Sequence, residues 1–349
     1  MTSHTTFGDA QLDELSAMVT RKVTTNKSGI YPFVDFRELM TELLCMFYSP
    51  GSHLISAGHF SPEVAQAADR AEIELVEQLG TSPFTGDLDS ALSRVSSPGD
   101  IIYVANPNRM TGSNFSLSDL EAMARAVPNG VLIIDEYYYD YFGISGLPLL
   151  DILTNVVILR SFTASFSIGS SDAGYAIATP EIVDNIRQSC GCKKISLTVR
   201  KTIMAAMGNS EAMANRLQEV HDESLRITTA LTRLGVQCRI CATDFILIRV
   251  ADHKCVGNYL ASVRIPIENL DGYPQLKNYI RYQIQSYLSN DRLIKAFQEI
   301  PGEYLRMKLS DKRAVRLRKG SHASNSNADD RIVERETLRK VDDKSPVIE

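Results

Sequence analysis

The sequence contains no long apolar run and no excess of positive charge. No stretch approaches the roughly 18 apolar residues that a membrane-spanning helix needs, and the start MTSHTTFGDAQ has neither the basic beginning nor the apolar core of a signal peptide. Lys and Arg number 37 against 42 Asp and Glu, and the net charge of -5 argues against a surface built to bind nucleic acid. We therefore expect a soluble, cytoplasmic protein that binds neither membranes nor nucleic acid.

The cysteines also lack any framework of regular spacing. The six positions are scattered: Cys45, Cys190, Cys192, Cys238, Cys241 and Cys255. In a cytosolic chain such cysteines are most simply buried thiols. Cys238 and Cys241 form a CxxC, but the surrounding apolar alternation is typical of a strand, where residues three apart point to opposite faces. We therefore expect no metal site.

Helical and strand patterns alternate over most of the chain. Apolar residues recur at helical spacing over residues 35–47 and 61–79, and the second segment opens on Ser-Pro-Glu. Short apolar runs typical of buried strands are DIIYVANPN, NGVLIIDEYY, NVVILRSF and AGYAIAT. Between the first two lies a helix start in which Ser116 is the N-cap and Asp119 follows three residues later. Strands separated by helices predict an α/β fold with a mostly parallel sheet covered on both faces.

Four regions follow from the change in pattern along the chain. We expect an N-terminal helix or arm over residues 1–30 that packs on the small domain, a large domain over 31–185, and a small α+β domain over 186–305. From residue 306 to 349 the composition is charged and polar, which predicts a disordered tail. Its basic run, MKLSDKRAVRLRKG, can dock on an acidic partner or RNA, although a solvated tail is the favoured interpretation.

Five passages in order resemble a known enzyme family. They are GIYPFVDFREL, NPNRMTG, DEYYYDYF, RSFTASFSIGSSDAGYAIA and YIRYQIQSYLSNDRLIKAF. Together they resemble the class I/II (fold-type I) pyridoxal-phosphate aminotransferases, and within them the histidinol-phosphate aminotransferase group. One such motif is weak evidence, whereas five in sequence are specific for the fold. The resemblance implies a large aminotransferase-like domain with a mostly parallel sheet and a smaller α+β C-terminal domain.

The resemblance also implies roles for five residues. Asp135 matches the aspartate that pairs with the cofactor's pyridine nitrogen, and Tyr138 matches the tyrosine that bonds the ring hydroxyl; the alternative for Asp135 is a strand-end residue that caps a turn. Phe60 falls where the family stacks an aromatic ring on the cofactor, although core packing explains it equally well. Arg281 matches the arginine that grips the substrate carboxylate, and an arginine in an apolar strand needs a partner. Tyr31 matches the tyrosine that crosses the dimer interface to the neighbour's cofactor phosphate.

The chain departs from the family pattern at four positions. Where the family has its catalytic lysine, four residues after Arg160, this chain has Ala164, which can neither form a Schiff base nor move a proton. Asp172 stands in place of the arginine that pairs with the cofactor phosphate, so that repulsion replaces attraction. Arg109 replaces the asparagine that bonds the ring hydroxyl, and Met110 replaces the proline after it. These changes predict that conventional transamination is absent or vestigial.

The phosphate-binding turn is also predicted to be missing. Between Tyr31 and the strand HLIS the family has a helix, a strand and a Gly-Ser-x-Glu turn at a helix N-terminus, whereas this chain has one helix and SPGS. The Gly-Ser at 51–52 can imitate the lost turn, but it precedes a strand. Lys193 and Lys194 would need a rearranged path to substitute for the lysine. Hydroxyl side chains that can bind a small polar ligand, or form a plain polar loop, are Ser161, Thr163, Ser165, Ser167, Ser170 and Ser171.

Three hypotheses for the function remain open. The first is a degenerate aminotransferase homologue that needs no cofactor and acts by binding a ligand or partner, as a homodimer or as a heterodimer with a related aminotransferase. The second is a cofactor-independent enzyme acting on an amino or keto acid whose carboxylate Arg281 holds, with Asp135 or the serine-rich turn as the acting group. The third is an aminotransferase of amino-acid or secondary-metabolite biosynthesis in which the pyridoxal phosphate is bound non-covalently.

Overall fold

The computed structural model describes residues 17, 19–20, 23, 28–141, 144–166, 173–190 and 197–307. Within these ranges the larger sheet has seven strands in the order β1-β7-β6-β5-β4-β2-β3. Their bounds are β1 (Gly29–Phe33), β2 (Leu54–Ala57), β3 (Leu75–Gln78), β4 (Ile101–Ala105), β5 (Val131–Asp135), β6 (Val156–Ser161) and β7 (Gly174–Ala178). Strands β3, β2, β4, β5 and β6 are mutually parallel, and β7 pairs antiparallel with β6 and with β1. The predicted mostly parallel sheet is confirmed.

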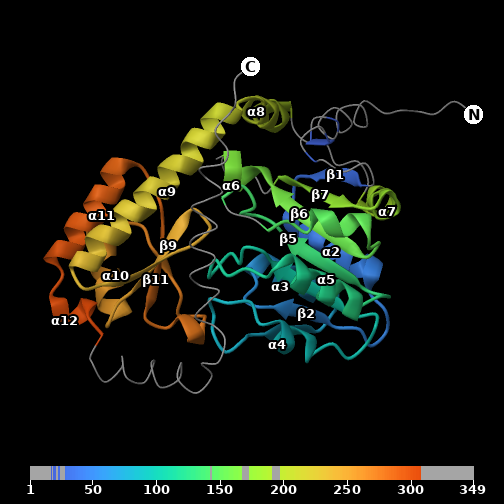
Figure 1. The fold of residues 1–349 in the computed structure, drawn as a ribbon, viewed down its shortest axis with the longest axis horizontal. Coiled ribbons are helices and arrows are strands. Elements are labelled where there is room, and N and C mark those ends of the chain that lie inside the picture. The colour runs from blue at the N-terminus through green and yellow to red at the C-terminus, as the bar shows by residue number, and fades with distance from the viewer. Residues whose placement is uncertain are drawn as a thin grey trace, which may run out of the picture.

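Helices cover both faces of this sheet (Figure 1). They are α2 (Phe36–Phe47), α3 (Pro62–Arg70), α4 (Leu88–Leu92), α5 (Leu117–Ala126), α6 (Phe162–Phe166) and α7 (Pro180–Cys190), with the 3-10 helix η1 (Leu147–Asp151). Alternate residues of β4 belong to different cores: Ile102 packs with α4 and α5, whereas Tyr103 packs with α2, α3 and α7. The expected capping box of Ser116 and Asp119 starts α5. Burial on both faces explains why the central strands are continuously apolar.

One predicted helix is wrong in its second half. The helical pattern over residues 61–79 gives α3 only as far as Arg70, after which the chain turns and continues as β3. Glu72 has a φ of 56°, in the left-handed region where an α-helix cannot continue. The segment LVEQ then pairs in parallel with β2, so sheet pairing overrides its helical pattern.

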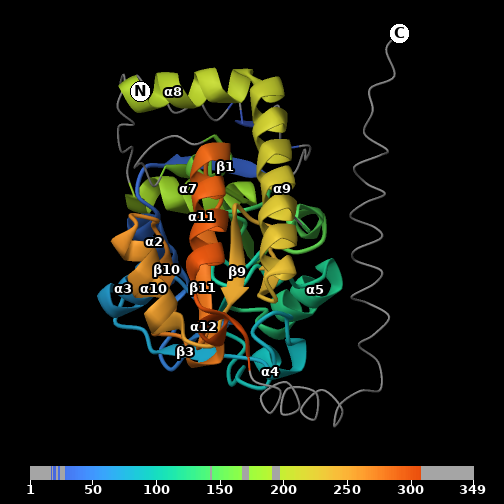
Figure 2. The ribbon, with the colours of Figure 1, turned by 90° about the vertical axis from the view of Figure 1, so that its left-hand side faces the viewer.

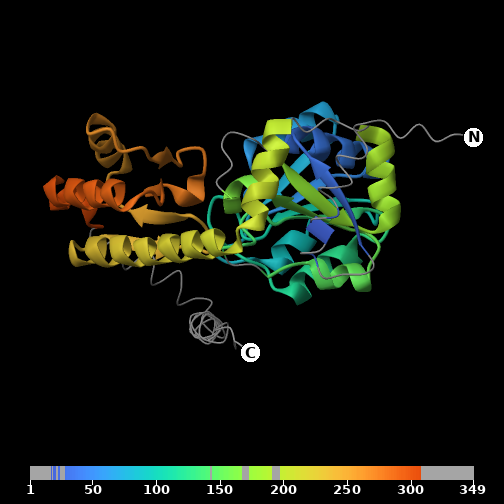
Figure 3. The ribbon, with the colours of Figure 1, turned by 90° about the horizontal axis from the view of Figure 1, so that it is seen from above.

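A smaller sheet forms the second domain. Its order is β10-β11-β9-β8, with bounds β8 (Gln237–Ile240), β9 (Phe245–Arg249), β10 (Glu268–Asn269) and β11 (Tyr279–Gln283). Its helices are α9 (Ser210–Arg233), α10 (His253–Ser262), η2 (Pro274–Leu276), α11 (Tyr287–Glu299) and α12 (Gly302–Leu305), and α8 (Leu197–Gly208) leads into α9. Helices α9 and α11 pack side by side on this domain (Figure 2). Seen from above, the two domains lie at opposite ends of the long axis (Figure 3).

The predicted boundaries differ from the packing at two places. The boundary at residue 185 falls inside α7, and because α7 packs on β1 and β7 the helix belongs with the large sheet. Val19 and Val23 lie in a core cluster of the large sheet and not on the small domain, where the N-terminal arm was predicted to pack. Near residue 306 the described chain still makes contacts, since Arg306 donates to the carbonyl of Leu234 at 3.1 Å. The tail from residue 308 lies outside the described residues.

The described residues bear on the cysteine, metal and membrane predictions. Cys45 and Cys255 are exposed, so the prediction of buried thiols is wrong for these two, while Cys241 is buried. Burial raises the pKa of Cys238 and of Cys241 to about 12, which keeps both thiols protonated. Among the described residues no cluster of His, Cys, Asp and Glu is suited to a metal ion. The same residues include no helix that is long and apolar enough to span a membrane.

Candidate functional site

The carboxylate of Asp135 lies at the carboxyl end of β5 and is almost fully buried, with 1% of its side chain exposed. The Tyr103 hydroxyl donates to its Oδ2 at 2.7 Å, and a guanidinium nitrogen of Arg109 lies 2.8 Å from the same oxygen. The backbone N–H of Tyr137 donates to Oδ1 at 3.1 Å. Both oxygens of this carboxylate are therefore occupied by groups of the same chain.

The guanidinium of Arg109 is held from three sides. It pairs with Asp135, and its central carbon lies 4.1 Å from the ring centroid of Tyr137 and 4.9 Å from that of Phe36. Burial lowers the pKa of Arg109, but the charge of Asp135 outweighs it, so the pKa stays above its usual value. Arg109 is thus permanently charged, and Phe36, the first residue of α2, brings that helix N-terminus to the same place.

The loop that carries Arg109 is braced by two asparagines. Asn108 donates from Nδ2 to the carbonyl of His59 at 2.7 Å, and its Oδ1 accepts from the backbone N–H groups of Met110 and Thr111. Asn106 accepts from the N–H of Phe115 at 2.8 Å. Because the loop is fixed by buried side chains, the position of residue 109 is fixed as well. The sequence analysis did not single out either asparagine, although both lie in the NPNRMTG passage.

Ala164 lies in α6, in an apolar cluster to which both domains contribute. Its side chain is 7% exposed and belongs to an apolar cluster with Met110 and Tyr138 of the large domain and Cys241 and Phe245 of the small domain. The Ala164 carbonyl accepts from a tyrosine hydroxyl of the large domain at 3.1 Å. The place expected of a lysine is therefore packed with apolar side chains.

Arg281 lies in β11 and has partners inside the chain. One guanidinium nitrogen donates to the Tyr138 hydroxyl at 3.1 Å, another pairs closely with Glu268, and the group lies 4.0 Å from the Phe245 ring centroid. Glu268 faces Arg281 in the register of β10 and β11. Burial raises the pKa of Tyr138, and Asp244 adds to it, so the hydroxyl stays protonated. Arg281 therefore has a protein carboxylate, Glu268, as its partner, and its predicted grip on a substrate carboxylate stays a prediction.

The other predicted site residues are packed or hydrogen-bonded within the large domain. Phe60 is half-buried and packs against the core cluster on the α2 side of the sheet, as the core-packing alternative supposed. Tyr31 is buried within β1 opposite Ala176, and it forms a hydrogen bond with the Cys190 thiol. Its role across a dimer interface stays a prediction. Ser161 accepts from the backbone N–H of Thr163 at 2.9 Å.

Part of the serine-rich turn lies outside the described residues. These residues are Ser167, Ser170, Ser171 and Asp172, together with the side chain of Ser165. Lys193 and Lys194 also lie outside the described residues. The roles predicted for all of them stay predictions.

Comparison with known proteins decides the family. A family model for class I and II aminotransferases matches residues 3–270. The chain belongs to the class I and II aminotransferase family. Among curated relatives, histidinol-phosphate aminotransferase of Chlorobaculum tepidum is 27% identical over 203 residues, 58% of either chain. That of Roseobacter denitrificans is 28% identical over 255 residues, 68% of this chain and 67% of the relative.

Solved aminotransferases share the fold. A putative histidinol-phosphate aminotransferase of Erwinia carotovora atroseptica has a TM-score of 0.73 at 18% identity, covering 83% of this chain and 86% of the other. Histidinol-phosphate aminotransferase of Sinorhizobium meliloti, solved in complex with pyridoxal-5'-phosphate, has a TM-score of 0.72 at 19% identity, covering 83% of this chain and 82% of the other. At such identities the likeness concerns the aminotransferase fold alone.

Between β1 and β2 of this aminotransferase fold lie the helix α2 and a short loop. Strand β1 leads through Val34 and Asp35 directly into the N-terminus of α2. The side chain of Asp35 caps that helix by accepting from the N–H of Glu38 at 3.0 Å. Tyr31 lies in β1 itself, and the deletion after it stays a prediction.

The Gly-Ser at 51–52 does not replace a phosphate turn. The two residues lie between α2 and β2, and Ser52 donates from its hydroxyl to the carbonyl of Ser49 at 2.8 Å, closing the loop on itself. No helix begins there, so the backbone N–H groups are not aligned by a helix dipole.

The residues of this aminotransferase-family chain do not fit pyridoxal phosphate. The carboxylate that would pair with a pyridine nitrogen already binds Arg109 and Tyr103. The Ala164 side chain cannot form a Schiff base, and the N-terminus of α2 is capped by the Asp35 carboxylate, which repels a phosphate dianion.

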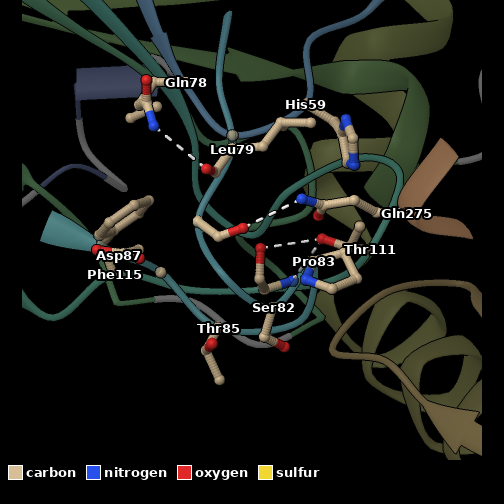
Figure 4. Close-up of a pocket in the computed structure, with 15 residues that line it drawn as sticks. His59, Gln78, Leu79, Ser82, Pro83, Thr85, Asp87, Thr111, Phe115 and Gln275 are labelled. Atoms are coloured by element: carbon tan, nitrogen blue, oxygen red, sulfur yellow. Dashed lines mark hydrogen bonds between the residues drawn. The ribbon is translucent and has the colours of Figure 1, made fainter. Parts of the chain in front are cut away.

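A separate, small cavity lies at the carboxyl ends of β2 and β3 (Figure 4). His59 lies on one side of it beside Gln275, and Gln78 lies on the other. The His59 side chain is 2% exposed, and its Nδ1 lies 3.2 Å from a carboxylate oxygen of Glu77. A carboxylate only accepts, so Nδ1 carries the hydrogen. Among the described residues Nε2 has no partner. No sequence signal pointed to His59.

Proposed function

We propose that this chain is an aminotransferase-family protein that does not carry out pyridoxal-phosphate-dependent transamination and acts by binding a ligand or a partner protein. The observation that carries the proposal is the closed pair of Arg109 and Asp135, with a nitrogen-to-oxygen distance of 2.8 Å. In transamination that carboxylate has to keep a pyridine nitrogen protonated, and here its charge is already neutralised by a guanidinium. Ala164 removes the covalent anchor and the proton carrier from the same site.

The absence of a base at position 164 has a large expected effect. A positioned general base contributes typically about 100- to 10,000-fold in rate, before any covalent step is counted. Tyr103 and Tyr138 are two of the hydroxyl groups near this position, and burial raises the pKa of both well above the ordinary value. Both hydroxyls therefore stay protonated at neutral pH, and neither is a phenolate that can act as a base.

The competing function, a cofactor-independent enzyme that holds a carboxylate on Arg281, is less well supported. Glu268 pairs with the Arg281 guanidinium, and the Tyr138 hydroxyl accepts a second bond from it. A substrate carboxylate would have to displace Glu268, whose side chain is 44% exposed. The carboxylate of Asp135, which that enzyme would need as its acting group, is bound to Arg109 and shielded from substrate.

An absorbance and reduction experiment tests the proposal. The purified protein is titrated with pyridoxal phosphate, reduced with borohydride, digested and analysed by peptide mass. We expect no visible-edge Schiff-base band beyond that of a lysine-matched control protein and no single lysine carrying the reduced adduct in stoichiometric amount. One saturating adduct on one lysine, with turnover of an amino-acid donor, would overturn the proposal.

The same proposal includes a partner protein to which this chain binds. Aminotransferases build their sites at two-fold interfaces, and we propose that this chain forms a homodimer or pairs with a related aminotransferase. Light scattering of the purified chain, followed by mixing with an intact aminotransferase of the same cell, separates the two. A chain that stays monomeric, alone and with such a partner, would contradict this part of the proposal.

A further inference from the structure

The surroundings of the Arg109 guanidinium form a pocket for a flat cation. The central carbon of the guanidinium lies 4.1 Å from the ring centroid of Tyr137 and 4.9 Å from that of Phe36. One of its nitrogens lies 2.8 Å from a carboxylate oxygen of Asp135. Aromatic faces attract cations and favour flat ones that can stack. We infer that this pocket is specific for a planar cation, and that Arg109 is an internal occupant standing where the family seats a pyridinium ring. This inference rests on the proposed function, since it supposes that no cofactor is seated in the natural protein.

The buried carboxylate of Asp135 requires a cation beside it. Asp135 has 1% of its side chain exposed, and without Arg109 its remaining partners are the Tyr103 hydroxyl and the Tyr137 N–H. A buried carboxylate that loses its cation either remains as an unpaired charge or takes up a proton, and both states destabilise the fold at neutral pH. The pocket should therefore bind a replacement cation when Arg109 is removed.

The loop explains why an outside molecule does not compete in the natural protein. The side chain of Asn108 holds the loop on both sides of Arg109 through its bonds to the His59 carbonyl and to the N–H groups of Met110 and Thr111. A group tethered on such a loop has an effective concentration in the millimolar range or above. A small cation in solution reaches the pocket only if the tethered one is absent.

A rescue experiment follows from these contacts. Arg109→Ala should lower the thermal midpoint of the full chain and leave a space beside Asp135. Methylguanidinium or protonated 4-aminopyridine, which are planar cations, should raise the midpoint of this variant by about 2 °C at ten times the dissociation constant. Aniline, the neutral ring of similar shape, and methylammonium, a cation that is not planar, should not. The natural protein should respond to none of the four.

Two further variants keep the test decisive if Arg109→Ala folds poorly. Arg109→Ala/Asp135→Asn removes both charges, so it should fold better than Arg109→Ala and should not respond to planar cations. Arg109→Lys keeps the charge and the tether but is not planar, so it should melt below the natural protein. The inference is overturned if planar cations stabilise Arg109→Ala no more than aniline does. It is equally overturned if the response persists in the double variant, or if Arg109→Ala melts at the temperature of the natural protein.

The outcome is independent of the test of the proposed function. Borohydride reduction of the unmodified protein decides whether the natural chain anchors pyridoxal phosphate. Cation rescue of the Arg109 variants decides what the pocket selects. A natural protein without an adduct, together with variants that ignore planar cations, would sustain the proposed function and refute only this inference.

Discussion

Replacing Arg160 with methionine should cost more stability than any surface change in the molecule. The Arg160 Nε lies 2.8 Å from Glu136 Oε2, and the two side chains are 8% and 0% exposed. The guanidinium also lies 3.6 Å from the ring centroid of Tyr139. Removing one partner of a buried ion pair costs about 3–5 kcal/mol because the other charge stays buried. We expect Arg160→Met to lower the free energy of unfolding by about 4 kcal/mol at pH 8.

The loss should depend on pH with a definite sign. Burial raises the pKa of Glu136 above its ordinary value even though Arg160 lowers it. Without Arg160 the folded-state pKa rises further, while the unfolded-state pKa is unchanged. At a pH between the two pKa values, Glu136 is protonated in the folded state and ionised in the unfolded state. The free energy of unfolding therefore falls by about 1.4 kcal/mol for each unit of pH across this interval. The cost of Arg160→Met should therefore be smaller at pH 5 than at pH 8.

Urea unfolding of four proteins measures this prediction. They are the natural chain, Arg160→Met, Glu136→Gln and the double variant, each at pH 5 and pH 8. The double variant buries no unpaired charge and should recover about 2 kcal/mol of the loss seen for Arg160→Met at pH 8. A cost below about 1 kcal/mol for Arg160→Met, an equal cost at both pH values, or a double variant no more stable than Arg160→Met would refute the reasoning.

Two further predictions concern other buried contacts. Asp100 is fully buried and accepts three backbone N–H bonds, which outweigh desolvation and keep its pKa lowered; Asp100→Asn should cost about 1.5–3 kcal/mol in urea unfolding at pH 7. Since a lowered pKa stabilises the fold above the ordinary value of 3.8, the gap between the two proteins should narrow below it. Gly112→Ala should lower the thermal midpoint, because Gly112 has a φ of 66° and an added Cβ would lie 2.6 Å from Cys241 Cβ. Gly208→Ala, which meets nothing within 4 Å, is its control, and equal midpoints for the two would contradict the strain argument.

The sequence predicted the large sheet and the place of Asp135 because these depend on local patterns. Each central strand is a short apolar run, and Asp135 ends one of them. The pairing of Arg109 with Asp135 was also within reach, since Arg109 follows β4 and Asp135 ends β5, and parallel neighbours bring their carboxyl ends together. From the sequence alone Arg109 stands only for a lost contact, whereas in the structure it supplies a new one to Asp135.

Other parts of the site depend on pairings between distant segments. Tyr31 was assigned from a lone Tyr-Pro, and its place in an edge strand depends on pairing with β7, far along the chain. Glu268 could not be matched to Arg281 without the register of β10 and β11, because β10 is only two residues long. The histidine of the separate cavity, His59, became visible only when Glu77 of β3 was placed beside it.

The loop held by Asn106 and Asn108 keeps its conformation independently of the side chain at position 109. The side chains of Asn106 and Asn108 bond to backbone groups of the loop and its neighbours, and none of these bonds involves the side chain at position 109. Residue 109 can therefore change without disturbing the loop, and with it can change whether the neighbouring carboxylate faces an external molecule or a group of the same chain. A single substitution at this position can therefore replace a bound external cation by an arginine side chain of the chain itself, while the loop keeps its conformation.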